Sequence, residues 1–245
     1  MFVSLRTSIG ILALVAVIAT SASCTGRLVR QYEYEEDLFV SLDGSATLYV
    51  NASMPAFAAL RGLEADTNPR AIVDRAYFRR AYSGEGVQVS RVTQSRRRGR
   101  RFVHLRLDVD DVRQLPRVAP LAWSAYQFGA EGDVVTFRQA VGAAAGKPVG
   151  DVGWRGDEIA GFRLHVPSRI LEHNSPTAVE RGNILVWEQT LRERQASAPL
   201  TIEVKMESTS ILSRTLLLFA ASGLAALLAL AAIIFWTFRR GKTNA

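Results

Sequence analysis

The chain has 245 residues, of which 48% are hydrophobic and 22% charged, and its formal net charge is +7. This composition excludes a disordered, a collagen-like and a disulfide-rich protein, and the length allows one folded domain with accessory segments. The mean hydropathy is slightly positive, at +0.08, because strongly apolar residues are concentrated at the two ends. An isoelectric point near 10.1 is typical of nucleic-acid-binding proteins, so its interpretation depends on where the charge lies.

The N-terminus has the pattern of an export signal. Arg6 precedes an uncharged apolar stretch at residues 9–19, and small residues then lead to Cys24. The apolar stretch is shorter than the roughly 20 residues that cross a bilayer, so residues 1–23 are predicted to be a secretory signal peptide. Cys24 stands where a bacterial lipoprotein carries its acyl chains, and we predict it as the site of lipid attachment.

Two alternatives remain open at this end, because Ser21 occupies the position at which lipoprotein signals usually have leucine. They are ordinary cleavage near this site and a retained helical anchor, with Cys24 as a free thiol in either case. Since Cys24 is the only cysteine, the exported part has no intramolecular disulfide and depends on its core for stability.

A second apolar segment lies near the C-terminus. Residues 215–238 contain no charged side chain and would span about 36 Å as a helix, enough for a hydrocarbon core of about 30 Å. We therefore predict a transmembrane helix at 214–238. Three basic residues follow in the tail 239–245, and the positive-inside rule places this tail in the cytoplasm and residues 24–213 outside. The expected location is the cytoplasmic (inner) membrane of a bacterium, with a single span.

The exported part is predicted to be one α+β domain built on an antiparallel sheet of five to eight strands, open or curled. Short intervals with turn residues between successive strands favour antiparallel meanders. Alternation of apolar and polar residues predicts the strands, at 46–52, 87–92, 102–109, 122–128, 134–141, 161–166, 184–190 and 200–206.

Two or three helices are expected on one face of this sheet. Pro55 begins a short helix that Gly62 can end, and Asn68-Pro69 marks the start of a second helix over residues 69–82. A third and shorter one is expected from Asp110-Asp111 to Pro116. A sheet curled around a helix would leave an apolar cavity, which is a common kind of ligand site.

The most distinctive segment is an arginine-rich hairpin loop between two predicted strands. Its five guanidinium groups create a local positive field, and arginine binds phosphate through two parallel hydrogen bonds. We predict that these side chains bind anionic headgroups, whereas the alternative is a solvated hairpin tip that discourages aggregation. The residues are Arg96, Arg97, Arg98, Arg100 and Arg101.

Two acidic groups and three histidines carry weaker signals. Asp110 and Asp111 are interpreted as helix-capping residues, since the spacing from Asp108 lacks the glycine and glutamate of a calcium loop. An acidic cluster is interpreted as a solvated edge that could pair with the arginine loop. It comprises Glu33, Glu35, Glu36 and Asp37. The histidines are expected to be exposed or hydrogen-bonded rather than ligands, at His104, His165 and His173.

No sequence motif for catalysis, nucleotide binding or metal binding occurs in the chain. A triad of serine, histidine and aspartate can be assembled from distant residues, but nothing in the sequence favours one. We therefore predict no enzyme activity, no catalytic residues, no metal and no cofactor.

The C-terminal part has Asn183 and Trp187 in a strand near the end of the domain, a following strand at 200–206 and a terminal membrane helix with a basic tail. In these features it resembles the LppM-domain lipoproteins. The resemblance implies a signal with a cysteine, an exported α+β domain that binds envelope lipids or glycolipids, and no catalytic residues.

The charge can now be assigned. Five basic residues belong to the signal and the membrane anchor, which leaves 25 basic against 23 acidic residues, or +2, in the exported part. Nucleic acid is excluded as a partner because the arginine loop would lie outside the cell. The predicted function is binding of an amphiphilic ligand or of anionic lipid by a membrane-anchored envelope protein. The alternative is an interaction or assembly module that recognises another envelope protein; the oligomeric state is left open.

Overall fold

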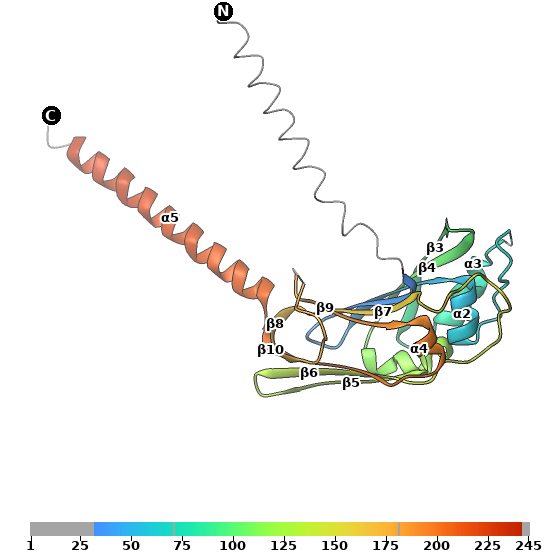
Figure 1. The fold of residues 1–245 in the computed structure, drawn as a ribbon. Coiled ribbons are helices and arrows are strands. Elements are labelled where there is room, and N and C mark those ends of the chain that lie inside the picture. The colour runs from blue at the N-terminus through green and yellow to red at the C-terminus, as the bar shows by residue number, and fades with distance from the viewer. Residues whose placement is uncertain (1–31, 71, 181, 242–245) are drawn as a thin grey trace, which may run out of the picture. The chain divides into compact units, whose positions relative to one another are not determined.

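A computed structural model describes residues 32–70, 72–180 and 182–241. The predicted signal peptide and Cys24 lie outside the described residues, as do residues 242–245 of the predicted tail. Ten strands fall into two sheets (Figure 1). Their bounds are β1 Tyr32–Val40, β2 Ala46–Ser53, β3 Val87–Arg97, β4 Arg100–Val109, β5 Ser124–Glu131, β6 Val134–Val141, β7 Ile159–His165, β8 Ser168–His173, β9 Ile184–Thr190 and β10 Leu200–Ser210.

The first sheet has six strands in the order β3-β4-β2-β1-β7-β9. Neighbours are antiparallel except β1 and β7, where Arg163 pairs with Glu35 and His165 with Asp37, so both strands advance in the same direction. This parallel pair makes the sheet mixed. The second sheet is antiparallel throughout, in the order β5-β6-β10-β8.

One hydrophobic core lies between the two sheets. Tyr34 of β1, Phe137 of β6 and Val204 of β10 belong to the same cluster and are fully buried. All members of this cluster fall within residues 34–206. Within the part of the chain that the structure describes, the two sheets therefore share one core.

Short helices pack against the strands and one another. They are α2 Met54–Arg61, α3 Arg75–Tyr82 and α4 Leu191–Gln195, with 3-10 turns η2 Val112–Arg117 and η3 Ala119–Leu121. α2 contacts β2, β4 and α4, and α3 contacts β3 (Figure 1). The α+β class is confirmed, and the strands that we expected in one sheet are divided between two.

The start of α2 matches its sequence signals. Ser53 Oγ accepts from the backbone N–H of Ala56, Pro55 occupies the first turn, and Gly62 ends the helix with a φ of 70°. The predicted helix over 69–82 is wrong in its first half, because it begins only after Asp74, whose carboxylate accepts from the N–H of Tyr77. In a helix that began at Pro69, the Pro69 carbonyl would accept a backbone hydrogen bond within the helix. Here two arginine side chains bind that oxygen instead.

The C-terminal apolar segment is helical, as predicted. Helix α5 spans Ile211–Gly241, and its part Thr215–Trp236 is long and apolar enough to cross a membrane. None of that window is buried against the rest of the described chain. An apolar surface of this size in water is unfavourable, and a bilayer would cover it.

Candidate functional site

The arginine-rich segment forms the tip of the β3–β4 hairpin. Arg96 pairs with Arg101 and Arg97 with Arg100, and Arg98 and Gly99 make the turn with positive φ angles of 45° and 74°. The structure thus brings all five predicted arginines together at the tip, but their side chains have different surroundings.

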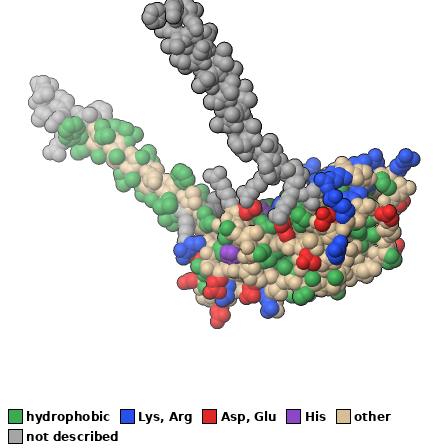
Figure 2. All heavy atoms as spheres, in the orientation of Figure 1, with side chains coloured by type: hydrophobic (Ala, Val, Ile, Leu, Met, Phe, Trp, Pro, Cys, Tyr) green, Lys and Arg blue, Asp and Glu red, His purple; other side chains and the backbone are tan. Residues whose placement is uncertain are grey.

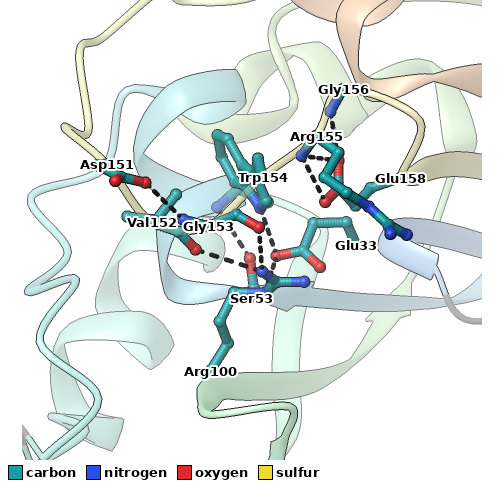
Figure 3. Close-up of polar contacts among 11 residues, drawn as sticks. Glu33, Ser53, Arg100, Asp151, Val152, Gly153, Trp154, Arg155, Gly156 and Glu158 are labelled. Carbon is teal, nitrogen blue, oxygen red and sulfur yellow. Dashed lines mark hydrogen bonds and ion pairs between the residues drawn. The ribbon is translucent and has the colours of Figure 1, made fainter.

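Arg100 is a structural residue. Its side chain is 13% exposed, and its Nε lies 3.1 Å from Oε1 of Glu33, whose own side chain is 2% exposed. Its Nη1 also donates to the carbonyls of Val152 and Gly153, both at 3.3 Å, while Trp154 Nε1 donates to Glu33 Oε1 at 2.9 Å. Figure 3 shows Arg100 and Trp154 meeting at the Glu33 carboxylate, with the Val152 carbonyl bonded to Arg100. Arg100 therefore fastens the loop around residue 153 to β1.

Arg96 and Arg101 both bind the segment that precedes α3. Arg96 Nη2 donates to the Pro69 carbonyl at 2.9 Å and Arg101 Nη2 donates to the same oxygen at 3.2 Å. These contacts hold residues 68–70 beside the hairpin. Three residues after Pro69, the side chain of Ile72 is 92% exposed.

The remaining two arginines are exposed. Arg97 stacks over the Phe102 ring, with its guanidinium carbon 5.3 Å from the ring centroid, and Arg98 lies at the turn. Figure 2 shows Lys and Arg side chains gathered over the region of this hairpin. The exposed side chains of Arg96, Arg97 and Arg98, together with Ile72 on the segment that Arg96 binds, are called the hairpin tip below.

The acidic cluster is not the solvated edge that we predicted. Glu33 and Glu36 are 1% and 3% exposed, because β1 is an inner strand of the first sheet. The predicted pairing with the arginine loop is correct for Glu33. Glu36 instead points into the core, where it accepts from Tyr34 Oη at 2.6 Å, Trp123 Nε1 at 3.2 Å and Gln139 Nε2 at 3.2 Å.

Two buried guanidinium groups lie close to the Glu36 network. Arg61 stacks over the Trp123 ring, and none of its three side-chain nitrogens has a hydrogen-bond partner among the described residues. Arg194 is fully buried and donates to Gln189 Oε1 at 2.9 Å and to the Gly142 carbonyl at 3.0 Å. Burial lowers the pKa of Arg61 to about 10, so it is charged at neutral pH, with Glu36 as an opposing charge.

Two histidines lie on the face of the first sheet that points away from the core, called the outer face below. His165 Nε2 is 2.7 Å from Asp37 Oδ1, and its ring stacks on Phe39 with centroids 3.7 Å apart. His104 bonds both Ser95 and Asn51. His173 lines a polar pocket of about 190 Å³ between β8 and β10. Among the described residues, no group of three His, Cys, Asp or Glu side chains could hold a metal ion.

Asn183 and Trp187, on which the family resemblance rests, make contacts within the fold. Asn183 adopts a left-handed backbone conformation with a φ of 57°, and its Nδ2 donates to the Ser168 carbonyl at 2.8 Å. Trp187 is 3% exposed within the core.

The comparisons with known proteins give one weak likeness. No protein-family model matches the chain, and no curated protein sequence is similar to it. The fold resembles the NMR structure of the folded domain of LppM from Mycobacterium tuberculosis, with 13% sequence identity and a TM-score of 0.43. The alignment covers 76% of this chain and 96% of that domain. The expected resemblance to LppM is thus found, at the level of a distant likeness in fold.

Proposed function

We propose that the chain is a bacterial envelope protein, held in the cytoplasmic membrane by α5, whose domain binds anionic lipid or glycolipid headgroups through the hairpin tip. The observation that carries this proposal is the presence of three exposed arginines at one hairpin turn, one of which binds the Pro69 carbonyl three residues before a nearly fully exposed isoleucine. Cationic side chains around an exposed apolar one favour adsorption to an anionic membrane surface, where the cations meet phosphate and the apolar group enters the interface.

The contacts of the hairpin support this assignment of roles. Arg100 and Arg101 are partly buried, and Arg100 is already paired with Glu33, so neither is fully available to a ligand. Arg96, Arg97 and Arg98 are exposed, and Arg96 also fixes the segment that leads to Ile72. The anionic ligand is therefore expected to meet residues 96–98 first.

Liposome flotation tests the proposal. A fragment of residues 32–210 retains the strands and the core of the described residues, and circular dichroism checks its folding. It is mixed with vesicles of phosphatidylcholine alone or of an equal mixture with phosphatidylglycerol. Each arginine near an anionic surface contributes about 1 kcal/mol, so the triple variant R96S/R97S/R98S should bind the mixed vesicles on the order of 10²-fold more weakly.

The matched control is R113S/R117S/R169S, which removes the same charge from exposed positions outside the hairpin. It should bind like the unaltered fragment. Ile72→Ser should weaken binding by roughly tenfold, since an exposed apolar side chain loses its transfer into the interface. Equal losses in the two triple variants, or equal binding to both kinds of vesicle, would mean that the hairpin tip is not a headgroup site.

A protein partner remains an outcome of a second experiment. If crosslinking of the full chain in native membranes captures a stoichiometric envelope protein through residues 96–98, and the purified chain carries no lipid, the alternative of an assembly module replaces the lipid proposal. Mass spectrometry of the same material reports any retained lipid and whether Cys24 is acylated.

A further inference from the structure

A continuous chain of polar contacts crosses the outer face of the first sheet. It begins at Ser95 on β3 and passes through His104 on β4 and Asn51 on β2 to Glu35 on β1. Asn51 is the direct cross-strand partner of both His104 and Glu35. Ser95 lies two residues beyond Thr93, the partner of His104 on β3, and therefore on the same face.

The geometry at His104 is that of a nucleophile, a base and an orienting group. Ser95 Oγ lies 2.8 Å from His104 Nε2, and Asn51 Oδ1 lies 3.0 Å from His104 Nδ1. Asn51 Nδ2 in turn donates to Glu35 Oε2 at 3.1 Å, and Glu35 Oε1 is 3.0 Å from Arg163 Nη1. Each member is held by the next, so the imidazole has a fixed position relative to the serine.

The same contacts select the tautomer of the imidazole. A Glu35 carboxylate can only accept a hydrogen bond, so it takes the amide N–H₂ of Asn51 and leaves the Asn51 oxygen facing His104. That oxygen accepts only from a protonated Nδ1. The proton of His104 therefore lies on Nδ1, and Nε2 presents its lone pair to the Ser95 hydroxyl.

The surroundings of His104 keep it in the neutral form that a base requires. Burial, and then the positive charge of Arg97, lower the pKa of His104 below its ordinary value of 6.5. The charged groups that face it from neighbouring strands are Arg97 on β3 and, through Asn51, Glu35 on β1, which is paired with Arg163 of β7. At neutral pH the imidazole is thus available to accept a proton.

We propose that Ser95, His104 and Asn51 form a serine-nucleophile site that hydrolyses carboxylic esters. Ser95 Oγ attacks the ester carbonyl carbon, its proton passes to His104 Nε2, and the carbonyl oxygen becomes an oxyanion. Collapse of this intermediate breaks the bond to the alcohol, which leaves with the proton from His104, and an acyl-Ser95 ester remains. Water then attacks that ester with His104 as base, which releases the carboxylic acid and restores Ser95.

Arg97 is the cation that would stabilise the oxyanion. It lies two residues from Ser95 on the same strand, so both side chains project from the same face, and its charge acts on His104. A positive group beside the carbonyl stabilises the negative oxygen more in the transition state than in the ground state. Ser95 and His104 are both partly buried, whereas Arg97 is exposed. An ester can therefore approach from the Arg97 side.

This activity shares Arg97 with the lipid binding proposed above, but Ser95 and His104 lie outside the hairpin tip, and a small neutral ester tests them without an anionic headgroup. The test uses the full chain in detergent micelles with two probes, p-nitrophenyl butyrate and a fluorophosphonate that labels activated serines. Ester hydrolysis and covalent labelling at Ser95 are expected. Labelling at position 95 should be lost in Ser95→Ala, together with the hydrolysis that depends on this nucleophile. In His104→Gln both the rate and the labelling should fall on the order of 10²-fold, which is the usual contribution of a positioned general base.

The matched control is Ser90→Ala. Ser90 is an exposed serine on the same strand, but its hydroxyl donates to the Arg106 carbonyl at 3.3 Å instead of to a histidine. This variant should retain the full rate and the full labelling. Retained circular dichroism in each variant separates a loss of chemistry from a loss of fold.

Asn51 is a positioning residue, and its role has a distinct signature. Asn51→Ala should lower the rate, whereas Asn51→Asp should restore much of it, since a carboxylate also accepts from Nδ1. The added negative charge should raise the pH midpoint of the rate, which reports the protonation of His104. If the full chain is labelled no faster than Ser95→Ala, or if labelling occurs at another serine, the proposed site is wrong.

Discussion

The buried carboxylate of Glu36 gives the sharpest prediction about stability. Glu36 is 3% exposed and accepts three hydrogen bonds, from Tyr34, Trp123 and Gln139. Glu36→Gln conserves the volume of the side chain but removes its charge. The amide keeps one acceptor oxygen and turns N–H groups toward Tyr34 and Trp123, whereas Gln139 Nε2 can still donate to Ser124 Oγ at 3.3 Å and to Tyr126 Oη at 3.2 Å.

The cost of this substitution follows from the charges left behind. Glu36 is the opposing charge for Arg61 and Arg194, both of which are buried. Removing one partner of a buried ionic network typically costs about 3–5 kcal/mol, because it leaves a buried charge uncompensated. With a urea dependence of about 2 kcal/mol per molar, a loss of about 4 kcal/mol lowers the midpoint by about 2 M.

Equilibrium urea unfolding of residues 32–210, followed by tryptophan fluorescence, measures the midpoint. Glu131→Gln is the matched control, since Glu131 is exposed at the end of β5, and it should change stability by less than about 0.5 kcal/mol. Arg61→Met in the Glu36→Gln background removes one stranded cation and should recover part of the loss. A Glu36→Gln midpoint equal to that of the control would refute the reasoning.

Three further outcomes are expected. Arg100→Ser should destabilise the domain by about 2 kcal/mol in urea unfolding because it strands the buried Glu33, whereas Arg98→Ser, at the exposed turn, should be neutral. Gly142→Ala should cost about 1–3 kcal/mol by the same measurement, since a Cβ there would collide with the Trp123 carbonyl. Burial raises the pKa of three of the six tyrosines above 10.0, so the folded state retains phenol protons that the unfolded chain loses. The melting temperature should therefore fall as the pH rises above about 10. The phenolate absorbance of these three tyrosines should appear only when the protein unfolds. They are Tyr34, Tyr82 and Tyr126.

Local signals in the sequence were sufficient for much of the fold. All eight expected strands correspond to β2–β7, β9 and β10, because alternation of apolar and polar residues survives wherever one face of a strand meets the core. Pro55 and Gly62 predicted both ends of α2, and the charge-free segment predicted the C-terminal helix. These features depend on residues within a few positions of one another.

The errors arose where distant residues decide the environment. β1 was missed because four acids within five positions indicate a solvated segment, although Tyr34, Leu38 and Val40 carry the alternating pattern of a strand. Its acids tolerate burial only because Arg100, Trp154 and Trp123 bind them from distant parts of the chain. The division of the strands into two sheets likewise depends on pairing that no local pattern specifies.

The proposed ester site shows the same limit. His104 was interpreted as an exposed or hydrogen-bonded histidine, which agrees with its contacts. Its relation to Ser95 and Asn51 depends on the register between β3, β4 and β2, and a shift of one residue would turn these side chains to opposite faces. The signal available in the sequence was a histidine and a serine placed on adjacent strands of one hairpin.

The acids of β1 show how part of the protein's charge is distributed in the fold. Alternation along this strand directs Glu33, Glu35 and Asp37 to the outer face, toward Arg100, Arg163 and His165, and directs Glu36 into the core, toward Arg61 and Arg194.

These acids are therefore engaged by basic groups inside the fold, and the charge of Arg97 in the hairpin tip also acts on Glu35. The domain's excess is only +2 by sequence, but the acids of β1 are largely buried whereas the arginines at residues 96–98 are exposed. It follows that substitutions at residues 96–98 should change the surface field with little effect on stability, whereas those at Arg100 or Glu36 should do the reverse. Comparing flotation with urea unfolding across these variants separates the binding surface from the scaffold that holds it.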